Sequence, residues 1–171
     1  MLAGALAALS LAISSRDPSG VATREGPGEA LADQCASHTG PPPGFRYATR
    51  PPASGPHRPR LPRGDERRLS DDELLHALEL GNVVLAYDAR RPPRELRALR
   101  DEVAGPFDVE LAAAGQAVLV VEHPAAEGIT ALAWARRLRT GDPADPALRE
   151  FTEAWLGQAA PRAGDACRDS G

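Results

Sequence analysis

Histidines are the side chains of this sequence best suited to chemistry, and there are four of them: His38, His57, His76 and His123. Imidazole is the commonest metal ligand among protein side chains. Glu79 follows His76 by three residues, so in a helix both side chains would lie on one face. That spacing is compatible with a metal site, and it is also common in helices that bind nothing. Taken singly, each histidine is more often structural or exposed than a ligand.

His57 ends the tight turn "SGPH", which begins at Ser54. Gly55 permits a backbone conformation that other residues avoid, and Pro56 restricts the residue before it. A turn built this specifically usually aims a side chain or lays the backbone against the core. A loop histidine folded back over a helix histidine is one way in which small sites are assembled, so we predict that His57 lies beside His76.

The residues around His76 predict a helix followed by a strand. Ser70 and Glu73 form an S-x-x-E capping box, and Gly81 is a natural helix stop. The segment "DDELLHALEL" between them is therefore expected to form a helix of about three turns. The apolar run "VVLAY", residues 83–87, predicts a buried strand directly after this helix.

The remaining segments predict a small domain with both helices and strands. The further expected elements are a helix from Pro92 to about Ala104, a strand over 117–122, and a helix that begins at Pro146 behind the cap Asp145. Residues 129–138 are ambiguous, and their alanine and arginine content suits a helix. Residues 38–68 are rich in proline and glycine and predict a long loop, with a short strand proposed over 45–48. We therefore expect a small single domain of the α+β class, with a three- or four-stranded sheet packed with about three helices and a long Pro/Gly-rich N-terminal loop.

Length and composition bound the class of protein. With 171 residues, 42% of them hydrophobic, the chain has the size of one domain with a single core. The net charge of -4 gives no reason to expect a basic face, so we predict no nucleic-acid partner. The sequence contains no G-x-S-x-G nucleophile elbow and no glycine-rich phosphate loop, so these classes of hydrolase and nucleotide-binding enzyme are not indicated. No residue is assigned a catalytic role.

The N-terminal segment predicts export. Residues 2–13 form an uncharged apolar run that is too short for a membrane span of about 20 residues but suits the core of a signal peptide. No Lys or Arg precedes this run, so two alternatives stay open: residues 1–15 are a signal peptide or a clipped membrane anchor. Residues 16–34 are expected to form a flexible linker and residues 35–171 the extracytoplasmic domain, secreted or membrane-anchored, with an unknown envelope partner.

The two cysteines agree with export. Cys35 opens the predicted domain and Cys167 lies close to the end of the chain. In an oxidising compartment, a pair at opposite ends suggests one disulfide that ties the termini together, which would stabilise the domain by about 4–5 kcal/mol in the chain-entropy model. The alternative is two unpaired thiols. No C-x-x-C motif is present, so a redox enzyme is disfavoured.

Three ordered motifs give the sequence a specific resemblance to a known family. They are "ATRPPASGPH" (48–57), close to N-P-P-T-S-G-P-H; "HALELGNVVLAY" (76–87), close to H-x-L-E-H-G-x-V; and "ALAWARRL" (131–138), whose Trp134 stands where members have A-W-G. Over roughly Cys35 to Trp155 the chain resembles the bacterial domain-of-unknown-function family 3105 (DUF 3105). Members are typically actinobacterial and related envelope proteins with an N-terminal membrane segment. The resemblance favours a strand within residues 129–138.

The resemblance also implies a metal site that has lost one ligand. The family motif H-x-x-E-H has two histidines four residues apart, but the second position is Leu80 here, which cannot bind a metal. That loss favours a non-enzymatic extracytoplasmic domain in which His57, His76 and Glu79 form a structural cluster. The alternative is a copper or zinc site in which His57 and His76 are ligands, while Glu79 is a further ligand or orients one.

Overall fold

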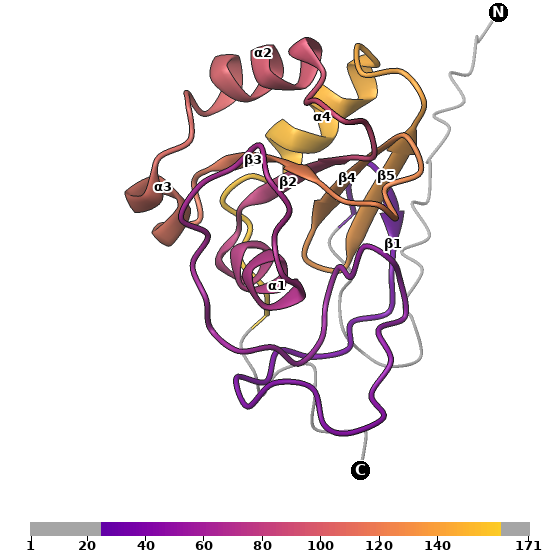
Figure 1. The fold of residues 1–171 in the computed structure, drawn as a ribbon, viewed down its shortest axis with the longest axis vertical. Coiled ribbons are helices and arrows are strands. Elements are labelled where there is room, and N and C mark those ends of the chain that lie inside the picture. The colour runs from indigo at the N-terminus through magenta and orange to yellow at the C-terminus, as the bar shows by residue number, and fades with distance from the viewer. Residues whose placement is uncertain (1–24, 162–171) are drawn as a thin grey trace, which may run out of the picture.

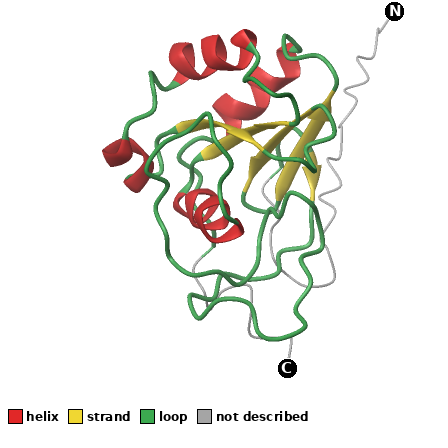
Figure 2. Cartoon of the chain, viewed as in Figure 1, coloured by secondary structure: helices red, strands yellow, loops and turns green. Residues whose placement is uncertain are grey.

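The computed structural model of the protein describes residues 25–161 (Figures 1 and 2). A five-stranded sheet forms its centre, in the order β1-β5-β4-β2-β3. The strands are β1 (Glu29–Ala30), β2 (Val83–Tyr87), β3 (Val118–Glu122), β4 (Ile129–Ala133) and β5 (Arg136–Thr140). Strands β2 and β3 are parallel, and the other neighbours are antiparallel. The predicted α+β class is therefore confirmed, with one strand more than the largest number expected.

Four helices cover the two faces of this sheet: α1 (Asp71–Leu80), α2 (Arg94–Val103), α3 (Val109–Ala113) and α4 (Pro146–Trp155). Figure 1 shows α1 on one face, with α2 and α4 on the other. Successive side chains of a strand point to opposite faces, so β2 contributes to two separate clusters. Val84 packs with Leu75 and Leu78 of α1, whereas Leu85 packs with Leu96 of α2 and Phe151 of α4. Both faces are covered, which explains why β2 is apolar throughout.

Helix α1 forms where the capping box predicts it. The hydroxyl of Ser70 accepts a hydrogen bond from the backbone N–H of Glu73, whose carboxylate accepts one from the backbone N–H of Ser70. Gly81 ends the helix with φ +109°, a conformation that costs glycine least. The helix therefore holds His76 and Glu79 on a rigid element whose apolar side is buried in the core.

The ambiguous segment over residues 129–138 is a β-hairpin made by β4 and β5. Trp134 and Ala135 form its turn, and Ala135 takes the left-handed conformation with φ +54°. The backbone N–H of Ala135 donates to the carbonyl of Ala53, and the indole N–H of Trp134 donates to Asp33. The hairpin turn thus holds the chain at Asp33, before the long N-terminal loop, and at Ala53, within it.

Three local features of the structure differ from the prediction. Residues 45–48 form no strand and lie in the loop, because Tyr47 instead anchors the turn that follows. Strand β1 was not predicted, since two residues are too few to show a period. Helix α3 was also missed, although Asp108 caps it by accepting hydrogen bonds from the N–H groups of Glu110 and Leu111.

The segment between β1 and α1 is irregular and wraps the end of the domain where α1 lies (Figure 2). It is held by specific contacts at the "SGPH" turn. Ser54 accepts a hydrogen bond from the N–H of Gln34, and Tyr47 donates one to the carbonyl of Pro56. Gly55 has φ +128°, and a Cβ there would lie 3.0 Å from the ring of Tyr47. The turn therefore needs glycine both for its conformation and for the close approach of the ring.

Two predictions concern residues outside the described range. The N-terminal segment 1–15, residues 16–24 of the linker and Cys167 are not among residues 25–161. Within residues 25–161, none of the helices has the length and apolar character needed to cross a membrane. The disulfide between Cys35 and Cys167 and the export of the chain stay predictions.

Candidate metal centre

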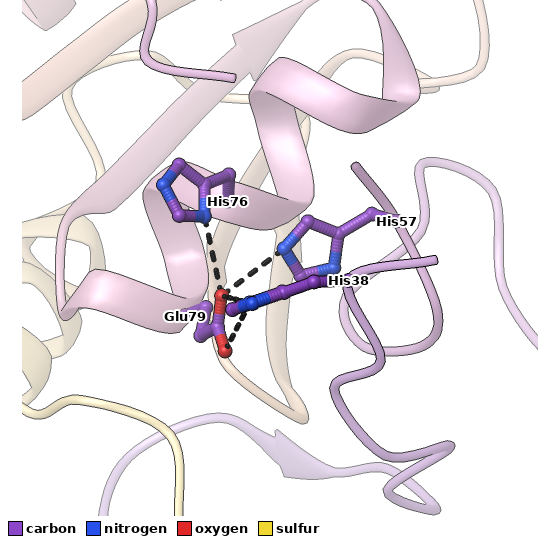
Figure 3. A group of neighbouring side chains, drawn as sticks. All are labelled: His38, His57, His76 and Glu79. Carbon is purple, nitrogen blue, oxygen red and sulfur yellow. Dashed lines mark hydrogen bonds and ion pairs between the residues drawn. The ribbon is translucent and has the colours of Figure 1, made fainter. Parts of the chain in front are cut away.

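Three histidines and one glutamate converge beside α1: His38, His57, His76 and Glu79 (Figure 3). His76 and Glu79 share one face of the helix. His57 reaches them from the "SGPH" turn, and His38 from the loop just after Cys35. One ligand atom from each of the four lies within 4.8 Å of all the others. The arrangement therefore brings three separate stretches of the chain to one point.

All three imidazoles face the same carboxylate oxygen, Oε2 of Glu79. The distances to it are 2.8 Å from Nε2 of His38, 3.1 Å from Nε2 of His57 and 3.2 Å from Nδ1 of His76. The rings are also neighbours of one another, with centroids 5.4 Å apart for His38 and His57 and 5.6 Å apart for His57 and His76. Three imidazole nitrogens therefore lie close together around one carboxylate.

Hydrogen bonds set the charges in this cluster. Burial alone would raise the pKa of Glu79, but hydrogen bonds from His57, His76 and His38 outweigh it, and the pKa of Glu79 falls well below its ordinary range. Burial alone would lower the pKa of His57, but its hydrogen bonds to Glu79 and to the Gly55 carbonyl leave the pKa raised. Glu79 is therefore ionised at neutral pH, and a proton on His57 competes with any cation that binds there.

The orientation of His57 is fixed by its backbone contact. The ring is fully buried, and its Nδ1 lies 3.0 Å from the carbonyl oxygen of Gly55. A carbonyl can only accept, so Nδ1 carries the hydrogen. In the neutral ring, Nε2 then presents its lone pair toward Glu79 and the other imidazoles. Metal-ligating histidines commonly have this arrangement, in which the outer N–H donates to a backbone carbonyl and the inner nitrogen binds.

The spacing of the four side chains suits a tetrahedral ion after a small contraction. Ligand atoms about 2.0–2.1 Å from a zinc ion lie roughly 3.3 Å from one another. The separations here extend up to 4.8 Å, so rotation of side chains would have to bring the donors closer together around an ion. The donors are imidazole nitrogen and carboxylate oxygen, which suit zinc and copper.

The structure brings His57, His76 and Glu79 together as predicted, and it adds His38. His38 was not predicted to belong to the cluster, because nothing in its sequence surroundings shows which way the loop folds. The weak signal in the sequence is that His38 shares the Pro/Gly-rich segment 38–68 with His57. His123 lies elsewhere, where its Nδ1 accepts a hydrogen bond from the N–H of Ala125.

The residues predicted to be a structural motif surround this cluster. Ser54, Gly55 and Pro56 build the turn that carries His57, and Gly81 ends the helix that carries Glu79. Trp134 closes one side, since its ring centroid lies 6.2 Å from that of His57. The motif therefore serves to position the cluster, through turn geometry on one side and an aromatic wall on the other.

We predict that the pKa values of His57 and His123 are shifted in opposite directions in protein freed of metal by a chelator. The pKa of His57 is raised, whereas burial lowers the pKa of His123. A proton NMR titration of the imidazole resonances should give a midpoint above about 6.5 for His57 and below it for His123. By linkage, the contribution of His57 to the unfolding free energy is complete below that pH and is lost as pH rises through its folded pKa.

The stability of the His123→Ala variant tests the same assignment for His57. This change removes the histidine whose lowered pKa would make the protein more stable as pH rises. The variant's unfolding free energy without metal should fall as pH rises from about 6 to about 8. A rise over that interval, or a His57 midpoint below that of His123, would contradict the charge assignment.

Comparison with known proteins gives one match. The model of a family described as "Protein of unknown function (DUF3105)" matches residues 38–169, which include all four members of the cluster. This confirms the resemblance inferred from the three motifs and extends it past Trp155. No curated protein matches the chain, and no solved structure does.

Proposed function

Because the chain belongs to the DUF3105 family, whose function is unknown, we propose a function from the site itself: the domain binds one transition-metal ion, zinc or copper, through His38, His57, His76 and Glu79. The observation that carries the proposal is the meeting of three imidazole nitrogens at one carboxylate oxygen. Neutralising a half-buried carboxylate needs only one such partner. Three of them, from three stretches of the chain, make a complete tetrahedral donor set together with the carboxylate of Glu79.

The chemistry of the donors narrows the choice of ion. Calcium and magnesium prefer sites made of oxygen ligands, and this cluster offers three nitrogens. The cluster contains no thiolate or thioether, so it lacks the soft donors that select copper(I). Imidazole with carboxylate suits zinc and copper(II). No catalytic residue is assigned, so the role proposed is binding of the ion.

A second candidate function is purely structural, and one observation favours it. Within residues 25–161, every buried polar side-chain atom has a hydrogen-bond partner, so the cluster is satisfied without a cation. In this case the imidazoles are the N–H donors that hold the "SGPH" turn and the His38 loop against α1. This is the interpretation that the loss of the family histidine at Leu80 favoured. His38 supplies a third imidazole in its place, and for that reason we put metal binding first.

The place of action that we propose is outside the cytoplasm, with the chain secreted or held at the membrane by its N-terminal segment. The support comes from the apolar run at residues 2–13 and from the pair Cys35 and Cys167. A site of this kind at the cell envelope would meet metal ions before the cytoplasm does, and its partner would be another envelope component.

Metal titration of the full chain tests the proposal. We expect chelator-treated protein to take up one Zn²⁺ or one Cu²⁺ per chain in calorimetry, with the same ratio in elemental analysis after dialysis. Binding to the folded state alone should add about 2.7 kcal/mol to the unfolding free energy when the free metal is a hundred times its Kd. If neither metal binds in a one-to-one ratio and neither raises the melting temperature, the structural role replaces this proposal.

A further inference from the structure

The four members of the cluster differ in their access to solvent. The side chain of His57 is 0% exposed, that of His76 is 13% exposed and that of Glu79 is 18% exposed. The side chain of His38 is 53% exposed. An ion held among them would therefore be shielded by three of its ligands and would face water on the side of the fourth.

The three shielded side chains also start from parts of the backbone that the fold holds in place. His57 is fixed at Nδ1 by the carbonyl of Gly55, and its backbone N–H donates to the carbonyl of Ser37. His76 and Glu79 belong to α1, whose apolar face is fully buried against the sheet. Moving the backbone that carries any of these three donors would disturb the core or the "SGPH" turn.

His38 is held differently. Within the described residues, the hydrogen bonds of its side chain run to Glu79, and its ring contacts run to His57 and His76. Its position thus depends on the cluster itself, and its ring can turn toward solvent without breaking a contact to the core. Figure 3 shows the ring of His38 reaching the carboxylate from a loop separate from α1.

On the basis of the proposed function, we propose that His38 is the exchangeable ligand of this site, through which the ion is received from and passed to the histidine of a partner. In the first step of the transfer, the bond between the ion and His38 breaks as a bond to the incoming imidazole forms; passage to the partner is complete once the partner's further ligands have replaced His57, His76 and Glu79 in the same way. His38 leaves as a neutral ring and the charge of the ion is unchanged. His57, His76 and Glu79 keep hold of the ion meanwhile, as three protein ligands do where a fourth position is open.

Free imidazole is the probe for this position. In the full chain, His38→Ala should still bind one Zn²⁺, with release to a chromogenic chelator at least about tenfold faster than from the unchanged protein. Added imidazole should slow that release again in a saturable way, because it can occupy the exposed position. The matched variant His76→Ala should bind less tightly than His38→Ala and should not respond to imidazole, since its position is shielded.

The outcomes separate the two proposals. If the unchanged protein binds neither Zn²⁺ nor Cu²⁺, the proposed function fails; if it binds Cu²⁺ alone, the release experiment is carried out with Cu²⁺. If it binds Zn²⁺ but imidazole restores His76→Ala as well as His38→Ala, or restores neither, the metal site stands and the exchangeable ligand is overturned. His38→Gly, with folding checked by circular dichroism, repeats the test in a second variant and should show the same rescue.

Discussion

Replacing His57 with alanine is expected to abolish stoichiometric metal uptake and to lower the unfolding free energy of the metal-free protein by about 2–4 kcal/mol. The ring is fully buried, so its removal leaves a cavity and leaves the Gly55 carbonyl without its donor. Glu79 also loses one of its three imidazoles. Even residues that merely orient a ligand change metal affinity by about 10–100-fold, so the loss of a buried ligand should cost roughly a hundredfold or more.

Zn²⁺ titration by calorimetry and urea unfolding in the presence of a chelator measure the two effects separately. His123→Ala is the matched control, because it removes a partly buried histidine outside the cluster. The control should keep one ion per chain. Full Zn²⁺ binding by a folded His57→Ala protein would remove His57 from the site, and a loss of stability with no binding in either protein would support the structural role alone.

Replacing Gly115 with alanine is expected to cost more than about 3 kcal/mol of unfolding free energy. A Cβ at this position would lie 2.0 Å from the carbonyl oxygen of Leu80, and φ is +72°. The obstructing atom belongs to the backbone at the end of α1, next to Glu79, so the clash is relieved only by shifting the helix end or the turn at Gly115. We therefore also expect weaker metal binding.

Gly105→Ala separates the clash from the backbone conformation. Gly105 has φ +78°, and nothing lies within 4 Å of a Cβ built on it. Alanine there should cost only about 1–2 kcal/mol, the penalty of a left-handed conformation. Urea unfolding of both variants gives the difference, which is the contribution of the contact with Leu80. An equal loss of unfolding free energy in the two variants would contradict the close contact between Gly115 and the carbonyl of Leu80.

Elements with local signals could be predicted from the sequence. The capping box at Ser70, the stop at Gly81 and the Asp145 cap before Pro146 fix α1 and α4 close to their expected bounds. The hairpin over β4 and β5 could not be settled from composition, because alanine and arginine favour helices and only pairing with β2 makes the segment a strand. Tertiary contacts decide such cases.

Three of the four members of the candidate site could be predicted from the sequence for the same reason. His76 and Glu79 lie on a helix with known periodicity, and the "SGPH" turn marks His57 as a residue held in a set direction. His38 carries no such mark, since its position follows from the hydrogen bond between His57 and Ser37 and from the path of an irregular loop. Distance along the chain says nothing about that path.

The irregular segment between β1 and α1 supplies two of the four donors, His38 and His57, and this has a consequence for how the domain opens locally. Regular hydrogen-bond ladders do not protect this segment, so its amides would exchange with solvent through small openings of low free energy. A bound ion must be released before such an opening can separate the donors. The opening free energy would therefore rise with the free-metal concentration, and the lifetime of the segment against proteases would follow the metal supply of its compartment.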